Sequence, residues 1–346
     1  MEEPRTVSSP IRVSLVALPD SAASTLFGVL DALNALSLMQ SAGVPDAGPF
    51  RTRIVSEQPG RLSIASGVSV DVENGIDELD TPELVIVPSV VLGAAGWKTG
   101  RFPRLRSFIT RAHERGAVLC SACSGIFLLA ETGLFDHKDA TLHFAYASAF
   151  AATFPDVRIH PERVLMVSGA REELVSSGAS TTWHDLVLYL IARYAGATHA
   201  HDVARSMALQ WHQDGLTPYL VFEGKTDHGD ADIASAQRWL REHFAIANPV
   251  EETMRRSSLA ERTFKRRFAS ATGLTPIAYV QRLRIEDAKH RLERTDASVD
   301  QISWQVGYED AAFFRRLFKR TTGLAPGAYR KRFRMPDFAG RSRRNK

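Results

Sequence analysis

Two cysteines stand three residues apart in the stretch GAVLCSACSGIFLLAETG, residues 116–133, and the chain has no others. Cys120 and Cys123 therefore suggest three kinds of chemistry: a redox pair, a catalytic nucleophile, or a polar group in a ligand pocket. The apolar run over 117–122 predicts a buried strand, and the residues from Ser124 onward predict a helix. A sharp strand-to-helix turn exposes its middle side chain beside backbone N–H groups and a helix N-terminus. We expect Cys123 to lie exposed at such a turn, where a thiolate or a bound anion is favoured.

Cys120 lies within the expected strand, so its side chain should point into the core or away from the turn. A thioredoxin-like pair needs both sulfurs at the start of a helix, and here only Cys123 is expected there. Two such cysteines cannot build a disulfide framework, which indicates a reducing compartment. A thiol redox sensor that uses both cysteines remains an alternative.

Several polar side chains could share a site with Cys123. His143 could supply an imidazole, and Asp20, Asp31 or Asp185 could supply an acid. A cysteine nucleophile needs a base and an orienting acid in contact with it, and no complete triad is visible in the sequence. We therefore expect no catalytic residues. The candidate ligand-binding residues are Cys123, Ser124, His143, Ser89, Trp183, His184 and Asp185.

Each candidate also has a purely structural interpretation. Trp183 could serve packing, and His184 and Asp185 could cap a helix or lie on the surface. A zinc site made of Cys123, His143 and His184 lacks any tight ligand spacing, so no metal is expected. The chain also has no glycine-rich phosphate loop of the Walker or dinucleotide type, so no cofactor is expected.

Apolar runs alternate with helical patterns from Ile11 onward. Four runs are typical of buried strands: VSLVAL, ELVIVPS, AVLCSAC and RVLMV. Two longer stretches are typical of helices: STLFGVLDALNALSLM and TTWHDLVLYLIARYAG. This order predicts an α/β domain with a parallel sheet and helices on both faces, a flavodoxin-like sandwich. Ligands in such sheets bind beyond the carboxyl ends of the strands, which is where Cys123 is expected.

The last third of the chain differs from the rest in charge. Residues 233–346 hold 25 Lys and Arg against 12 Asp and Glu, whereas residues 1–232 carry a net negative charge. Contacts from Lys and Arg to phosphates supply most non-specific affinity for nucleic acid, so nucleic acid is the first candidate partner. The first ten residues show no signal peptide, and no apolar run approaches the length of a membrane span. A cytoplasmic, nucleoid-associated protein with no membrane contact is expected.

The basic third contains an internal repeat. Two stretches of nineteen residues carry identical residues at ten positions: FKRRFASATGLTPIAYVQR, residues 264–282, and FRRLFKRTTGLAPGAYRKR, residues 314–332. Each copy predicts a helix-turn-helix unit, the first beginning with Asn248 as N-cap and the second with a Ser298–Gln301 capping box. One long helix, residues 276–294, is expected between the copies. It could hold the two units about one turn of DNA apart, roughly 34 Å.

The second helix of each unit has an aromatic seam on one side and a basic face on the other. Phe264 and Phe268 recur as Phe314 and Phe318 at the i and i+4 spacing of a buried helix face. An arginine-rich face opposite such a seam suits the major groove of DNA. The expected DNA-facing residues are Arg262, Lys265, Arg266, Ala312, Arg315, Arg316 and Lys319.

Residues 233–334 resemble an AraC/XylS-type DNA-binding domain, in the phrases RTFKRRFASATGLTPIAYVQRLRIEDAKHRL and VDQISWQVGYEDAAFFRRLFKRTTGLAPGAYRKRF. Ala260 departs from the Ser that such domains commonly have as N-cap. Residues 11–215 resemble the PfpI-like, class I glutamine amidotransferase-like superfamily, in LVIVPS, AVLCSACSGIFLLAETGLFDHKDATLHF and SSGASTTWHDLVLYL. The order of the two parts is similar to GlxA-type transcriptional regulators.

The resemblance implies a ligand-sensing domain over residues 11–222, a linker over 223–237, a double helix-turn-helix domain over 238–334 and a basic tail over 335–346. It implies a homodimeric regulator, an activator by the habit of the family. Its expected partners are promoter DNA, RNA polymerase and an unknown small-molecule effector. In the superfamily's enzymes a histidine works with the cysteine, but Ser124 follows Cys123 here and Ser89 stands where glycine is usual. A cysteine-dependent hydrolase, amidase or isocyanide-hydratase-like enzyme with a DNA-binding domain is the alternative.

Overall fold

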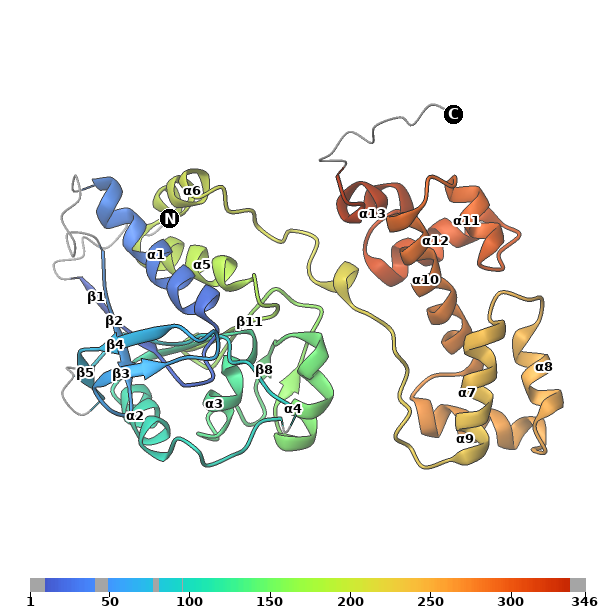
Figure 1. Cartoon of the computed structure of the whole chain (residues 1–346), viewed down its shortest axis with the longest axis horizontal. Helices are drawn as coiled ribbons and strands as arrows, with labels where there is room; N and C mark the ends of the chain where they lie inside the picture. Colours follow the sequence, from blue (N-terminus) through green and yellow to red (C-terminus); the bar gives the residue numbers. More distant parts are fainter. Residues whose placement is uncertain (1–9, 41–48, 77–80, 95, 337–346) are drawn as a thin grey trace. The chain divides into compact units, whose positions relative to one another are not determined.

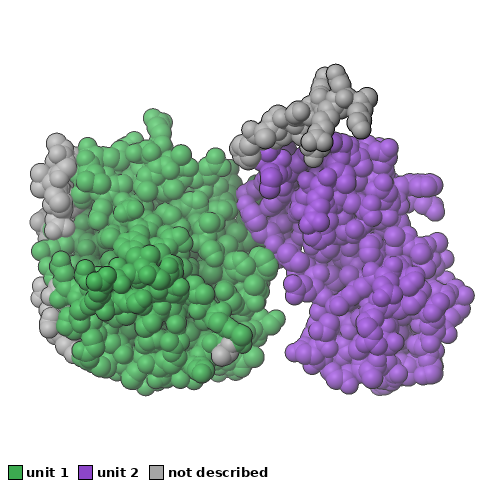
Figure 2. Space-filling model, in the orientation of Figure 1, with its two compact units in different colours: residues 1–216 green, residues 217–346 purple. Residues whose placement is uncertain are grey.

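The computed structural model of the chain describes residues 10–40, 49–76, 81–94 and 96–336 (Figure 1). The chain forms two compact units, Met1–Leu216 and Thr217–Lys346, coloured separately in Figure 2. Most of the basic tail expected over 335–346 lies outside the described residues.

Unit 1 is built on a seven-stranded sheet. Its strands are β1 (Ile11–Val16), β2 (Phe50–Ser56), β5 (Asn74–Gly75), β6 (Leu84–Val87), β7 (Val118–Ala122), β10 (Leu165–Ser168) and β11 (Leu174–Ser177). They lie in the order β10-β11-β7-β6-β1-β2-β5. Two further pairs flank the sheet, β3 (Gly60–Ser63) with β4 (Ser69–Val72), and β8 (Asp139–Ala140) with β9 (Arg158–Ile159).

The expected parallel sheet is confirmed, with one antiparallel edge. All neighbours in the seven-stranded sheet are parallel except β10 and β11. The few residues between Ser168 and Leu174 allow only a tight turn, and a parallel crossover needs a dozen or more.

Helices cover both faces of the sheet, as the sequence predicts (Figure 1). One face carries α1 (Ala23–Gln40), α5 (Trp183–Ala195) and α6 (Ala197–Ser206), and the other carries α2 (Pro103–Glu114), α3 (Ile126–Ala130) and α4 (Ala147–Thr153). Along β7 the side chains alternate between these two cores, with Cys120 in the first and Leu119 in the second. The prediction that Cys120 points into the core is therefore confirmed.

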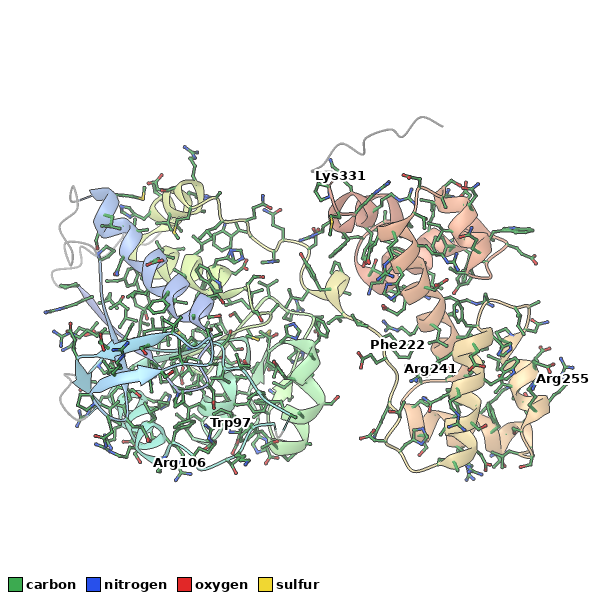
Figure 3. All side chains as sticks on the ribbon, viewed as in Figure 1. Trp97, Arg106, Phe222, Arg241, Arg255 and Lys331 are labelled. Atoms are coloured by element: carbon green, nitrogen blue, oxygen red, sulfur yellow. The ribbon has the colours of Figure 1, made fainter. Side chains whose placement is uncertain are left out.

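The end of unit 1 differs from the expected boundary at 222/223. Residues 217–222 form no strand, and Thr217–Tyr219 is a short 3-10 helix, η3, that already belongs to unit 2. The ring of Phe222, labelled in Figure 3, packs edge-on against Tyr279 at a centroid distance of 5.1 Å. Lys289 Nζ donates to the carbonyl oxygen of Leu220 at 2.6 Å. The apolar side chains of this segment pack within the helical unit and add no strand to the sheet.

The segment expected as a linker, residues 223–237, also belongs to unit 2. Helix α7 (Ala231–His243) begins within it, and Asp230 caps that helix by accepting from the backbone N–H of Ile233 at 3.2 Å. Ile233 and Gln237 are buried. The second half of the expected linker is therefore the capped start of a helix.

Besides η3, unit 2 contains seven α-helices within the described residues. They are α7 (Ala231–His243), α8 (Pro249–Arg256), α9 (Glu261–Thr272), α10 (Pro276–Arg294), α11 (Val299–Gln305), α12 (Ala311–Thr322) and α13 (Pro326–Phe333). Figure 1 shows α7, α8 and α9 at one end of α10, and α11, α12 and α13 at the other. The chain thus forms two helix-turn-helix units joined by one long helix.

The sequence repeat is repeated in the packing. Phe268 meets Tyr279 edge-on at 5.3 Å between ring centroids, and Phe318 meets Tyr329 in the same way at 5.4 Å. The predicted aromatic seams therefore form the cores of the two helix-turn-helix units, and all four seam phenylalanines are fully buried.

The helix starts confirm one capping prediction and correct another. Ser298 and Gln301 form the predicted capping box of α11. Asn248 occupies the N-cap position of α8, but its side chain makes no capping hydrogen bond. Its φ of 50° places the residue in the left-handed region, away from the extended geometry that points an N-cap side chain at the free N–H groups. Ala260, before α9, likewise caps nothing.

Candidate functional site

The residues expected to face DNA lie on α9 and α12. All seven are exposed, while the seam phenylalanines Phe264, Phe268, Phe314 and Phe318 of the same helices are buried. Arg262, Lys265 and Arg266 come from α9, and Ala312, Arg315, Arg316 and Lys319 come from α12. The exposed positions agree with the predicted faces, and the contacts with bases or phosphates remain a prediction.

Two of these side chains form ion pairs with carboxylates. Lys265 forms an ion pair with Glu261 one turn earlier in α9. Arg315 pairs with Asp300 of α11. Both pairs are largely exposed, so salt and water screen them strongly and either cation can exchange partners at little cost.

Arg284 in α10 connects the two helix-turn-helix units. Its guanidinium donates to the carbonyl oxygens of Phe244 at 2.8 Å and Ile246 at 2.9 Å on one side, and of Gly307 at 2.7 Å on the other. It also lies over the ring of Tyr308, at 5.0 Å from the centroid. Arg284 thereby holds the chain after α7 against the turn between α11 and α12.

Gly307 allows this close approach. A Cβ atom at this position would lie 2.5 Å from the carbonyl oxygen of Ala245, and the φ of +90° is one that glycine adopts without strain. The role of Arg284 was not predicted from the sequence. The acceptors of Arg284 are all backbone carbonyl groups, which no residue type in the sequence marks.

A cavity of about 490 Å³ lies beside this junction in unit 2. Its lining includes Met254, Lys265, Ile277, Val280 and Arg284, from α8, α9 and α10. It contains none of the residues that the sequence assigned to a ligand.

Cys123 occupies the turn between β7 and α3, as the sequence predicts. Its φ of 53° is unusual for a residue with a side chain and is characteristic of a strained strand-to-helix turn. Gly125 makes the turn possible, because a Cβ atom there would lie 2.3 Å from the carbonyl oxygen of Val87 at the end of β6. The turn, the 3-10 helix η1 (Cys123–Gly125), is thus packed directly on the neighbouring strand.

The expectation that Cys123 is exposed and readily ionised is wrong. Only 1% of the residue is accessible, and its Sγ lies 3.9 Å from Ser180 Oγ. Burial raises the pKa of the thiol, and hydrogen bonds from Ser180, Ser124 and the backbone of His143 only partly oppose that effect. Desolvation disfavours the charged form more than the turn's donors stabilise it, so the thiol is neutral at pH 7.

Ser124, Ser89 and Trp183 serve packing and loop geometry. Ser124 Oγ donates to the carbonyl oxygen of Val90 at 2.6 Å and accepts from its N–H at 3.0 Å. Ser89 Oγ accepts from Thr25 Oγ1 at 3.1 Å. Trp183 packs so closely on α1 that a Cβ atom at Gly28 would lie 2.6 Å from its ring. These contacts fix the loops around the turn.

His143 lies near Cys123 through its backbone. Its ring stacks on Phe144 at 4.3 Å, and its Nδ1 accepts from the backbone N–H of Ala145 at 3.2 Å. Burial lowers the pKa of the imidazole, which is therefore neutral at pH 7. Burial raises the pKa of Tyr146, a nearby residue that was not predicted, and a negative charge on the Cys123 sulfur would raise it further.

Each acid considered as a partner of Cys123 is either engaged by another residue or exposed. Asp20 pairs with Arg101 at 2.5 Å, and Asp31 is exposed on α1. His184 and Asp185 form a cluster with His212, a residue that sequence analysis missed. Within the described part of the chain, neither a carboxylate nor an imidazole forms a hydrogen bond with Cys123.

Residues 254–332 match the family described as "Helix-turn-helix domain". The HTH-type transcriptional regulator CdhR of Pseudomonas aeruginosa is 26% identical to this chain over 298 residues, 83% of this chain and 84% of that protein. The HTH-type transcriptional activator RhaS of Salmonella arizonae is 38% identical over 94 residues, which span 27% of this chain and 34% of RhaS. The chain is a homologue of HTH-type transcription regulators.

The fold of the regulator's α/β part also has a counterpart among solved structures. A crystal structure of a protein from Vibrio parahaemolyticus covers 58% of this chain and 100% of its own length, with a TM-score of 0.50 and 20% identity. This likeness concerns the fold alone. The predicted order of an α/β domain followed by a helix-turn-helix domain is thereby confirmed. Within the described residues, no helix of the regulator is both long and apolar enough to cross a membrane.

Proposed function

We propose that this regulator binds promoter DNA with α9 and α12 and that a small molecule bound in unit 1 controls this binding. The observation that carries the proposal is that α9 and α12 each present an exposed, basic face. Arg284 connects the two helix-turn-helix units to which these helices belong. A single recognition helix fits the major groove, and a pair with fixed spacing reads two successive grooves. The regulator would then contact one face of the duplex across about two helical turns.

Footprinting of the promoter tests the DNA contacts. The double variant Arg262→Ala and Arg315→Ala should weaken binding by at least about tenfold, since each base or phosphate contact contributes roughly 1–3 kcal/mol. Arg106→Ala, on the exposed face of α2 in unit 1, is the matched control (Figure 3). Unchanged binding by the double variant would exclude α9 and α12 as the reading helices.

We propose that the effector binds at the turn that carries Cys123. The turn lies beyond the carboxyl end of β7, where open α/β sheets bind their ligands. The backbone N–H groups of Ser124 and His143 and the hydroxyl of Ser180 converge near the sulfur and would recognise an oxygen-bearing group. Screening the full chain against small metabolites by thermal shift tests this site, because a ligand of the native state raises the unfolding midpoint.

The role proposed for unit 1 is binding without turnover. The neutral thiol of Cys123 and the absence of a hydrogen-bonded base among the described residues support this role over the hydrolase alternative. Cys123→Ser tests it with amide and nitrile substrates. Turnover by the wild type that this variant abolishes would establish the enzyme alternative.

Homodimer formation, contact with RNA polymerase and action in the cytoplasm complete the proposal. They are supported only by the resemblance of the chain to transcription regulators and by no contact within this chain. Sedimentation of the full chain with and without promoter DNA tests the dimer. A monomer in both conditions would exclude it.

A further inference from the structure

Two histidines and an aspartate meet at the start of α5. His184 and Asp185 lie in its first turn, and His212 comes from the irregular segment after α6. The three side chains are 14%, 6% and 13% exposed. One donor atom from each lies within 4.8 Å of the other two.

Asp185 holds the cluster together. Its Oδ1 accepts from the backbone N–H of His212 at 3.0 Å, and its Oδ2 lies 2.6 Å from His212 Nδ1. The same Oδ2 lies 3.6 Å from His184 Nε2, which is too long for a hydrogen bond. His184 Nε2 is therefore buried without a hydrogen-bond partner. Such an atom is costly in a folded protein and indicates that the site accepts a further group.

We propose that His184, Asp185 and His212 bind a divalent transition-metal ion of the zinc type. Two imidazole nitrogens and one carboxylate oxygen are a donor set that zinc sites use with one position left open. Calcium and magnesium prefer oxygen ligands, so this donor set favours Zn²⁺, Co²⁺ or Ni²⁺ over them. Sequence analysis predicted no metal, because His212 lies 27 residues from Asp185 and outside any ligand motif.

The two distances between Asp185 and the histidines are close to those that such an ion needs. Ligand atoms in a tetrahedral zinc site lie about 3.3 Å apart, given bonds of about 2.0–2.1 Å. The 3.6 Å between His184 Nε2 and Asp185 Oδ2 is close to that value. Asp185 Oδ2 and His212 Nδ1, now 2.6 Å apart, would move apart by less than 1 Å. The ion would replace the proton shared between these two atoms, and the proton would pass to solvent.

The bound ion would join the irregular segment to α5. His212 precedes the end of unit 1 at Leu216 by four residues, and Leu216 itself packs on the sheet, where a Cβ atom at Gly178 would lie 2.3 Å from its side chain. The ion would therefore stabilise the part of unit 1 from which the chain continues into the DNA-binding unit. The site stands on its own contacts and is independent of the function proposed for Cys123.

Metal titration of the full chain, purified without a histidine tag and treated with a chelator, tests the proposal. Zn²⁺ should bind at about one ion per chain, and Co²⁺ should give the intense visible bands of a four-coordinate site. His184→Ala and His212→Ala should each weaken binding at least about tenfold. His201→Ala, which removes an exposed histidine of α6, should bind as the wild type does.

Asp185→Asn keeps the size of the side chain and guards against loss of folding in the alanine variants. It should retain the circular dichroism spectrum of the wild type and lose most of its affinity for Zn²⁺. A wild type that takes up no Zn²⁺ or Co²⁺ would overturn the proposal. Binding that survives in both His184→Ala and His212→Ala would overturn it as well.

Discussion

The guanidinium of Arg284 donates to the carbonyl oxygen of Gly307 at 2.7 Å, although 23 residues separate the two in the chain. Arg284 lies in the helix between the two helix-turn-helix units, and Gly307 lies in the turn of the second unit. The same guanidinium also donates to the carbonyl oxygens of Phe244 and Ile246, beside the first helix-turn-helix unit. One side chain thus fixes the position of the second helix-turn-helix unit relative to the first.

Arg284→Ala should therefore impair both stability and recognition of a two-part site. Hydrogen bonds from a charged donor contribute about 1.5–3 kcal/mol each, and water that enters the gap will replace part of them, so a net loss of about 2 kcal/mol is expected. Hydrogen exchange of the amides of α11 measures this loss. Binding to a DNA with both half-sites should weaken more than binding to either half-site alone.

Arg284→Lys is the matched control for this prediction. It keeps the charge but replaces the planar fork with a single ammonium, which cannot reach carbonyl groups on two sides at once. Like the alanine variant, it should lose more affinity for a DNA with both half-sites than for either half-site alone. Equal losses on half-sites and full sites would show that Arg284 contributes to stability alone.

The same residue shows what sequence reasoning could and could not supply. The two helix-turn-helix units were predictable because their seams, such as Phe314 and Phe318, lie within single helices and repeat at a fixed offset. The acceptors of Arg284 are backbone groups from two distant turns. Backbone acceptors leave no residue-type signal in a sequence.

The α/β unit shows the same limit. The position of Cys123 after a buried strand was predictable from the local pattern, whereas its burial depends on Ser180 and on the loop around His143. His212 joins Asp185 only because the segment after α6 returns to the start of α5. Periodicity predicts elements and their order, but it does not predict which loops cover a site.

Asp300→Asn should strengthen DNA binding. Asp300 pairs with Arg315, one of the predicted DNA-facing residues, and also places a negative charge beside that face. Removing this charge frees Arg315 for phosphate and reduces repulsion, so affinity should rise roughly threefold at low salt and less at high salt. A gel-shift titration at two salt concentrations measures the change. Asp202→Asn, which removes the same charge from α6 in unit 1, should leave the affinity unaltered.

Cys123 should react slowly with iodoacetamide at pH 7 and faster as the pH rises. Burial raises the pKa of its thiol, so the thiolate forms only above the range of an ordinary cysteine, and only the thiolate attacks. We expect at least about a tenfold lower rate than for free cysteine at pH 7. Ser180→Ala removes a hydroxyl that stabilises the thiolate and should slow the reaction further. Cys120 is an internal control, because burial raises its pKa to about 12 and the core shields it until the protein unfolds.

Asp230→Asn should lower the unfolding midpoint of the regulator at neutral pH by a few degrees at most, and the difference should vanish in acid. Asp230 accepts two hydrogen bonds from Arg267, which hold the pKa of its carboxyl below the usual range. A depressed carboxyl pKa contributes stability above the pKa of the unfolded chain, near 4, and this contribution is lost as pH falls through the folded-state value. Asparagine still caps α7, so the variant isolates the ion pair from the cap. Melting curves of the wild type and the variant between pH 7 and pH 3 measure how the difference between their unfolding midpoints decreases. A difference in midpoint that persists unchanged at pH 3 would assign the effect to the cap.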